Sequence, residues 1–300
     1  MGINNHMDNL KKTALQKAAV FYNMQREQKI KFIALGIIFI LIISVIIYVR
    51  YKISLYDANC KTLKKVYNSR PSLSSVSSNS PYLLRDFYIK TAYNCCASGQ
   101  FKADFVGLCA LRTCIEQGAR CLDFEIYSID NQPVIAVSSV DDFTVKQSFN
   151  SISTADAFNT ILNMAFSNTH CPNPDDPLIL HFRMFSKNAP MYDILAKQIS
   201  SILNSKILGV NYSFEFGGRN LGAVPIKNFL GKIIIIADAS NPLYQKTKLD
   251  EYINMTSGSP FMRMLHFHFF CWYLPLFIIP INFDPLHMPY LPGSLKKQCR

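Results

Sequence analysis

Charge is scarce in this chain of 300 residues, since only 17% are Asp, Glu, Lys or Arg while 49% are hydrophobic. The mean hydropathy of +0.11 is high for a soluble protein, so a membrane segment is to be expected. The net charge of +11 is not gathered in a long basic run, and zinc-ligand spacings and the aromatic-glycine signature of RNA-binding domains are absent. These absences exclude the common classes of nucleic-acid-binding protein, and we expect no nucleic-acid partner.

The sequence also lacks a Cys-x-x-Cys pair, and its nine cysteines are scattered and odd in number. Cys109 and Cys114 fall within a helical pattern, and Cys121 begins a strand-like run. A disulfide framework in a small secreted domain shows paired spacings instead. We therefore predict that these cysteines are small buried hydrophobic residues and that the chain occupies a reducing compartment.

One stretch contains no charged residue at all, residues 32–49, FIALGIIFILIISVIIYV. As a helix it would be about 27 Å long, close to the roughly 30 Å of a bilayer core. A signal peptide is the alternative, but it would have a shorter apolar core and a small-residue cleavage site. We predict a single-pass membrane protein with this helix as its N-terminal anchor. Basic residues flank both ends in similar number, which leaves the orientation open.

The rest of the chain divides around this transmembrane helix. Residues 1–31 form a basic N-terminal segment, and residues 50–81 form a juxtamembrane helix followed by a Ser-rich linker. Residues 82–263 form the main domain. Residues 264–300 form an apolar tail of unclear structure, in which prolines argue against a second spanning helix.

Strand and helix patterns alternate through the main domain. Cys121–Tyr127 alternates apolar and polar residues, and Gly231–Asp238 contains four consecutive isoleucines, as in a strand buried on both faces. Apolar residues at helical spacing predict helices over 101–117 and 153–166. This order of elements predicts an α/β fold with a parallel sheet, either open or closed into a barrel.

Asp123 and Glu125 lie two positions apart on a predicted strand. Their side chains therefore point the same way, about 6.5–7 Å apart along the strand. Paired acids near the end of a strand can hold a divalent cation or share a proton. A solvated strand face would carry the same residues, and the pattern alone does not choose between the two.

Five short blocks, in the same order, resemble the X region of the phosphoinositide-specific phospholipases C, which form a divided (β/α)₈ barrel. The blocks are Thr91–Cys95, Gly118–Tyr127, Pro133–Ser138, Pro177–Phe185 and Leu230–Ile236. The resemblance covers about residues 84–240 and includes X-like proteins encoded by some large DNA viruses. It implies an incomplete or divided TIM-type barrel, because the main domain is shorter than the roughly 250 residues of a full barrel.

Compared residue by residue, the resemblance implies a degenerate active site. The positions of the two family histidines are occupied by Tyr93 and Val137, and a phosphate-binding lysine falls on Ile236. Valine cannot transfer a proton, and a tyrosine with a pKa near 10 is poorly matched to proton transfer at pH 7. We therefore assign no catalytic and no phosphate-binding residue.

Of the four calcium-ligand positions that the resemblance implies, Asn94, Asp123 and Glu125 keep an oxygen ligand, and Arg183 occupies the fourth. An arginine brings a permanent positive charge to a site for a dication. Two alternatives follow. Either Ca²⁺ binds because the site is still functional, or Arg183 pairs with one of the acids and replaces the metal, in which case no cofactor is expected.

The resemblance therefore implies a membrane-anchored phospholipase C X-like domain, impaired as an enzyme, that binds a membrane lipid such as a phosphoinositide headgroup, or a protein partner. An active phosphoric diester hydrolase with a rearranged site that includes His181 is one alternative, and a structural membrane component is another. His181 fits better as a buried structural histidine. Two glycosylation sequons, at Asn211 and Asn254, matter only if the domain is lumenal.

Overall fold

The computed structural model describes residues 12–13, 15–20, 22, 26–139, 145–258, 263–264 and 281–282. It consists of two compact units, Met1–Ser54 and Leu55–Arg300. Most of the predicted basic segment before residue 26 and nearly all of the predicted apolar tail, 264–300, lie outside the described residues.

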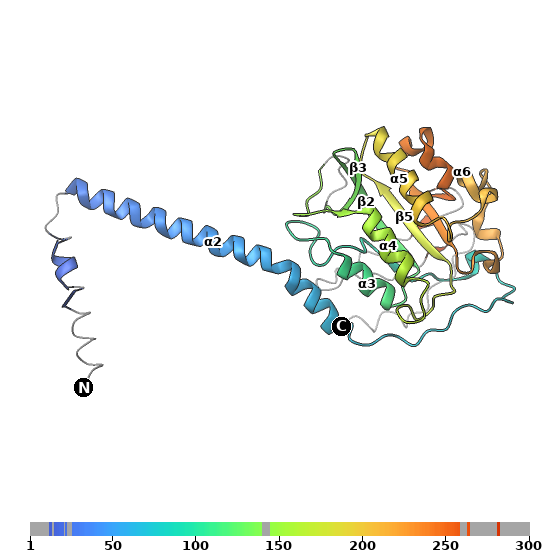
Figure 1. Cartoon of the computed structure of the whole chain (residues 1–300), viewed down its shortest axis with the longest axis horizontal. Helices are drawn as coiled ribbons and strands as arrows, with labels where there is room; N and C mark the ends of the chain where they lie inside the picture. Colours follow the sequence, from blue (N-terminus) through green and yellow to red (C-terminus); the bar gives the residue numbers. More distant parts are fainter. Residues whose placement is uncertain are drawn as a thin grey trace. The chain divides into compact units, whose positions relative to one another are not determined.

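The apolar run of the first unit is helical. It lies within helix α2, Arg26–Val66, shown in blue in Figure 1. By length and composition this helix is able to cross a membrane, although a signal sequence meets the same criterion. The large apolar side chains between Phe32 and Val49 are exposed, whereas the core helix of a soluble protein would bury them.

The second unit is built on a mixed sheet of seven strands (Figure 1). The strands are β1 (Thr91–Ala92), β2 (Cys121–Ile129), β3 (Gln132–Ala136), β4 (Ile152–Ser153), β5 (Leu178–Met184), β6 (Ile233–Asp238) and β7 (Met255–Ser257). They are ordered β4-β3-β2-β5-β6-β7, and β1 pairs with the start of β2. Pairing is parallel from β2 through β7 and between β1 and β2, and antiparallel at β3 and β4.

This topology confirms the predicted α/β class. Among the described strands, β4 and β7 mark two unpaired edges, so the sheet is an incomplete barrel and not a closed one. A separate two-stranded sheet joins β8 (Arg263–Met264) to β9 (Ile281–Asn282).

Helices α3 (Leu108–Glu116), α4 (Thr154–Met164) and α5 (Ala189–Ile202) cover one face of the sheet (Figure 1). Their apolar side chains pack against Leu122, Phe124 and Ile126 of β2 and the equivalent residues of β5 and β6. The other face of the sheet is covered by short segments. These are α6 (Ser213–Phe216) and the 3-10 helices Leu84–Asp86, Val210–Tyr212, Leu221–Ala223 and Ile226–Phe229, whereas the 3-10 helices Pro242–Lys246 and Lys248–Tyr252 pack with α5 in the core of the first face.

The helix predicted over 101–117 is shorter than expected and begins only at Leu108. Asp104 explains the difference, because its side chain accepts hydrogen bonds from the backbone nitrogens of Gln100 and Phe105, at 2.9 and 2.8 Å. An aspartate that binds neighbouring backbone donors in this way competes with helix formation.

The Ser-rich segment at residues 69–81 is not separate from the head. The backbone nitrogen of Val76 donates to Asp176 Oδ1 at 2.6 Å, and Gln117 Nε2 donates to the carbonyl oxygen of Ser69 at 2.9 Å. Ser80 is buried. The second unit accordingly begins at Leu55, within α2, and includes the segment that the composition suggested was a linker.

Candidate functional site

The second face of β2 and β5 has four polar side chains at its centre. Asp123 lies opposite His181 in the strand register, and Glu125 lies opposite Arg183. Because side chains alternate along a strand, all four point to the same face, while their neighbours Phe124 and Phe182 lie in the helix-covered core. The four polar side chains are buried.

Asn94 joins this cluster from the turn after β1. Its backbone nitrogen donates to Asp123 Oδ2 at 3.0 Å, and its side-chain Nδ2 donates to Glu125 Oε1 at 3.0 Å. Its φ of +45° lies in the left-handed region, which asparagine adopts more readily than most residues. The structure therefore brings together the three residues that the resemblance implies as calcium ligands.

The guanidinium of Arg183 lies between the two acids. Nη2 donates to Asp123 Oδ2 at 2.7 Å and Nε donates to Oδ1 at 3.1 Å, while Nη1 lies 3.0 Å from Glu125 Oε1. Nη2 also donates to Asn94 Oδ1 at 2.6 Å, and Cζ lies 4.4 Å from the centroid of the Tyr93 ring. The first of these contacts is the bidentate geometry that binds carboxylates most strongly. Arg183 is thus paired with both acids in this structure.

The hydrogen bonds to this cluster leave little capacity for a metal. Both oxygens of Asp123 and Glu125 and the Oδ1 of Asn94 accept hydrogen bonds, and Glu125 Oε2 does so from the Tyr127 hydroxyl at 2.9 Å and the Ser138 backbone nitrogen at 2.8 Å. Calcium needs six to eight oxygen ligands and here would lie beside a fixed guanidinium charge. The residues in this arrangement therefore do not fit a calcium ion.

Other metals have no better site within the part of the chain that the structure describes. There, no three His, Cys, Asp or Glu side chains are grouped so that they could hold a metal ion.

A second arm of the cluster leads from Asp123 to β7. His181 Nδ1 lies 2.6 Å from Asp123 Oδ1, and His181 Nε2 lies 2.9 Å from the hydroxyl of Ser257. This is the order Asp-His-Ser found in nucleophilic relays. His181 and Ser257 are only 2% and 4% exposed, and the Ser257 hydroxyl also lies 3.3 Å from Asp238 Oδ2. Ser257 was not predicted from the sequence, because only the parallel pairing of β6 with the three-residue strand β7 places it beside His181.

The two positions of the family histidines do not form a pair. Val137 belongs to the apolar core, while Tyr93 covers the guanidinium of Arg183 and lies edge-on to Phe101, with ring centroids 5.9 Å apart. Ile236, at the position of the phosphate-binding lysine, is buried between His181 and Met255 in the strand register. None of these three side chains carries a positive charge that could bind a phosphate.

Burial and the neighbouring positive charge have opposite effects on the pKa values of Asp123 and Glu125. Burial alone would raise the pKa of Asp123, but the Arg183 charge and the hydrogen bond with His181 hold that pKa well below its ordinary value. For Glu125 burial wins and raises the pKa, although Arg183, Asn94 and Tyr127 offset part of the effect. Asp123 is therefore the ionised partner of Arg183, whereas Glu125 takes up a proton more readily.

Comparison with known proteins gives matches at the level of structure alone. No family model and no curated protein matches the chain. PLC21 of L. pealei is 15% identical, with a TM-score of 0.44 over 63% of this chain and 25% of that one. A calcium-dependent phosphoinositol-specific phospholipase C from Pseudomonas sp. is 8% identical, with a TM-score of 0.40 over 63% of this chain and 71% of that one. These similar structures are phospholipases C.

A third example, a phosphatidylinositol-specific phospholipase C from Staphylococcus aureus carrying the F249X mutation, is 11% identical, with a TM-score of 0.29 over 65% of this chain and 56% of that one. The chain spans only a quarter of the length of PLC21. With identities this low and TM-scores below 0.5, the function of this chain has to be inferred from its own side chains.

Removal of the Arg183 charge would leave Asp123 buried without its partner. We expect Arg183→Met to lower the free energy of unfolding by about 3–5 kcal/mol, the usual cost of breaking a buried ion pair on one side. Urea denaturation of the full-length chain in detergent measures the change. Arg219→Met is the control, because Arg219 makes exposed contacts over the Phe216 ring and its loss should cost less than about 1 kcal/mol. Equal costs for both variants would contradict the central role of Arg183.

The two acids should also differ in how they couple stability to pH. The depressed pKa of Asp123 gives stability that is present above the unfolded value, about 3.9, and is lost as pH falls through the folded value. The raised pKa of Glu125 gives stability that is present below about 4.3 and is lost as pH rises through the folded value.

Asp123→Asn should therefore flatten the loss of stability on the acid side, and Glu125→Gln should flatten the loss at higher pH. Each change is at most about 1.4 kcal/mol per pH unit, which corresponds to one proton. Urea denaturation of both variants at several pH values between about 3 and 7 measures it. If the slope of the free energy of unfolding against pH changed in the same direction in both variants, the opposite pKa shifts assigned to Asp123 and Glu125 would be contradicted.

Proposed function

We propose that this chain is a single-pass membrane protein whose phospholipase C X-like head binds a phospholipid headgroup without calcium-dependent hydrolysis. The observation that supports this most directly is the guanidinium of Arg183 between Asp123 and Glu125. It supplies positive charge at the place where the resemblance implies a calcium ion. Unlike that ion, a guanidinium has no open coordination position to polarise a phosphate or to activate a hydroxyl.

The positions around Arg183 support the same proposal. General acid–base groups contribute about 10²–10⁴-fold to a rate, and Val137 and Tyr93 do not replace a pair of histidines. The Asp123–His181–Ser257 arrangement favours a second candidate, a hydrolase with a rearranged site. We favour binding over hydrolysis because these three side chains are buried and their hydrogen bonds are already formed within the domain.

A polar cleft next to the cluster is the place that we propose for the headgroup. It has a volume of about 520 Å³ and is lined by Ser128, Asp130, Asn131, Phe185, Ser186, Lys187 and Asn188. The Phe185 ring stacks on Tyr127, with centroids 5.4 Å apart, and Tyr127 donates to Glu125, so the cleft borders the buried cluster. Lys187 is exposed and brings a positive charge to the cleft, which suits a phosphate group, while the exposed carboxylate of Asp130 offsets part of that charge.

The anchor supports a lipid ligand over a soluble one. A head that is covalently attached to a membrane helix meets lipid headgroups at a high effective concentration. Weak binding by one lysine and a few polar groups is then sufficient for occupancy. A protein partner is the alternative ligand, and the binding experiment below separates the two.

The loss of calcium binding is tested by restoring a carboxylate at position 183. We expect excess Ca²⁺ to leave the thermal unfolding midpoint of the wild type unchanged and to raise that of Arg183→Glu, because the variant regains an oxygen ligand. Arg183→Gln is the matched control, which removes the positive charge without adding a carboxylate. Micromolar Ca²⁺ binding by the wild type in calorimetric titration would overturn the proposal.

Headgroup binding is tested on the full chain in detergent with glycerophosphoinositol, a soluble phosphodiester that carries the headgroup, as the probe. We expect binding without ester hydrolysis, weakened about 10–100-fold by Lys187→Ala, as for the loss of a charge-assisted hydrogen bond. Lys197→Ala on the exposed side of α5 is the control and should leave binding unchanged. Hydrolysis of the probe that Asp123→Ala abolishes would establish the hydrolase instead, and neither binding nor hydrolysis would leave a protein partner or a structural role.

A further inference from the structure

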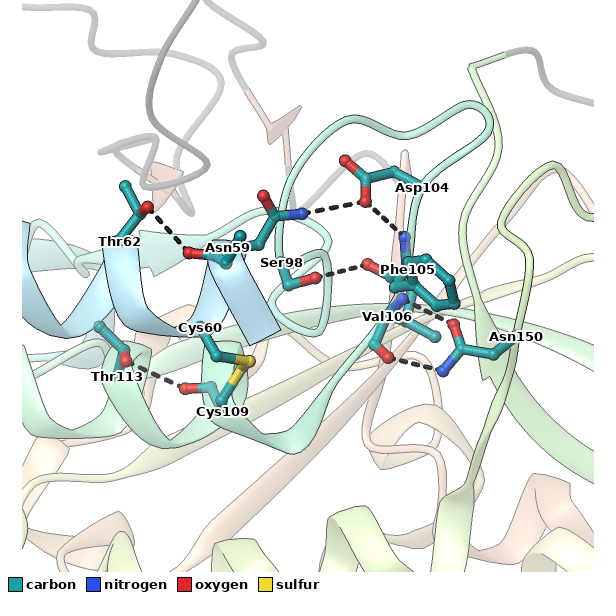
Figure 2. Close-up of a disulfide and its surroundings, with 11 residues drawn as sticks. Asn59, Cys60, Thr62, Ser98, Asp104, Phe105, Val106, Cys109, Thr113 and Asn150 are labelled. Atoms are coloured by element: carbon teal, nitrogen blue, oxygen red, sulfur yellow. Dashed lines mark hydrogen bonds between the residues drawn. A yellow bond between two sulfur atoms is a disulfide. The ribbon is translucent and has the colours of Figure 1, made fainter. Parts of the chain in front are cut away.

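The structure contains a disulfide between Cys60, near the end of α2, and Cys109, in the first turn of α3 (Figure 2). The two Cα atoms are 5.8 Å apart, in the middle of the range for disulfides. Both residues belong to the second unit. The sequence-based interpretation of Cys109 as a small buried hydrophobic residue is therefore wrong.

Contacts other than the disulfide hold the two cysteines together. Asn59 Nδ2 donates to Asp104 Oδ1 at 2.9 Å (Figure 2). The Tyr56 ring lies edge-on to Phe105, with ring centroids 6.0 Å apart. Leu63 is buried. In the sequence, Tyr56 lies three residues before Asn59 and four before Cys60, and Leu63 lies four residues after Asn59 and three after Cys60, so all four residues lie on one face of the helix.

Small residues on the domain allow this face to pack closely. A Cβ atom added at Gly107 would lie 2.7 Å from the Tyr56 ring, and one added at Gly99 would lie 2.5 Å from Asn59 Nδ2. Real Cβ atoms essentially never come this near to another heavy atom. The close approach of α2 to the domain therefore depends on these two glycines, because a larger residue at either position would prevent the contact.

The other described cysteines differ from this pair. Cys60 and Cys109 are half-buried, whereas the free thiols are buried. Those buried thiols belong to Cys95, Cys96, Cys114, Cys121 and Cys171. Burial raises the pKa of Cys114 to about 12, which keeps it protonated and unreactive. Among the described cysteines, oxidation is thus directed to the pair that the fold places together near the surface.

The two glycosylation sequons also differ in their exposure to solvent. Asn211 is exposed, in the 3-10 helix Val210–Tyr212, and Ser213 follows that helix. Asn254 is buried, accepts a hydrogen bond from the Ile235 backbone nitrogen at 2.8 Å and donates to the Tyr212 carbonyl at 3.0 Å. Only the first sequon is on the surface of the folded domain.

We infer from these observations that the head lies on the non-cytosolic, oxidising side of the membrane, with the Cys60–Cys109 disulfide closed and Asn211 available as an N-glycan acceptor. Disulfides persist on that side and are reduced in the cytosol. The inference fixes the orientation that the flanking charges left open and replaces the expectation of a reducing compartment. It is independent of the headgroup proposal.

Disulfide formation and N-glycosylation both use reactants that this compartment contains. The two thiols lose two electrons and two protons to a disulfide of a protein oxidoreductase, which is reduced to its dithiol. At Asn211 the side-chain nitrogen forms a bond to the first sugar of a lipid-linked oligosaccharide. The bond from that sugar to the lipid diphosphate breaks, and the amide loses one proton.

The orientation is tested by translating the full chain into sealed microsomes. We expect protection of the domain from protease added outside, and a mass increase that an endoglycosidase removes. Asn211→Gln should abolish this increase, and Asn254→Gln, at the buried sequon, should leave it. Digestion of the domain by the external protease, or an unglycosylated protected domain, would overturn the orientation or the assignment of Asn211, respectively.

The disulfide is tested on the same material by counting maleimide-reactive thiols after denaturation. Reduction should add two thiols that belong to this pair in the wild type, and this gain should be lost in the double variant Cys60→Ser, Cys109→Ser. Cys60→Ser alone should leave Cys109 reactive without reduction. An unchanged count in the double variant would show that the pair does not form. Protease protection keeps the test valid if a variant folds poorly, because translocation does not require the disulfide.

Discussion

The interior of this domain depends on the charged and polar groups that compensate for the burial of two carboxylates, those of Asp123 and Glu125. Each buried acid costs several kcal/mol of lost hydration unless opposite charge and hydrogen-bond donors replace the water. Here one guanidinium serves both acids, and Asn94, His181, Tyr127 and a backbone amide donate to the oxygens that remain. The donors come from β1, β2, β3 and β5 or their ends. The cluster therefore joins four strands whose own hydrogen bonds link them only to their neighbours.

The sequence predicted much of this arrangement. The alternation in β2 and the block of isoleucines in β6 were sufficient to predict the α/β class, and the strand register then explains why Asp123 and Glu125 face Arg183. The pairing of arginine with the acids was one of two alternatives because residue types alone do not show which donors fill a carboxylate's lone pairs. Ser257 could not be predicted, since its position depends on a pairing between β6 and a strand of three residues.

The errors have physical causes as well. The helix over 101–117 was predicted too long because apolar spacing does not register an aspartate that binds the backbone in place of the helix. The disulfide was missed because Cys60 was assigned to a separate juxtamembrane helix, and a pairing across 49 residues leaves no local trace in the sequence. The same helix face shows how it could have been found, since Tyr56, Asn59, Cys60 and Leu63 share a spacing that a solvent-exposed helix has no reason to keep.

The saturation of the acids also constrains what this protein can become in evolution. A carboxylate in place of Arg183 would bury three negative charges until a cation was bound among them, and a lysine in place of Ile236 would be buried in the apolar strand β6. Each of these changes alone would destabilise the domain unless compensating changes occurred with it. Selection for stability alone is therefore sufficient to keep the present cluster.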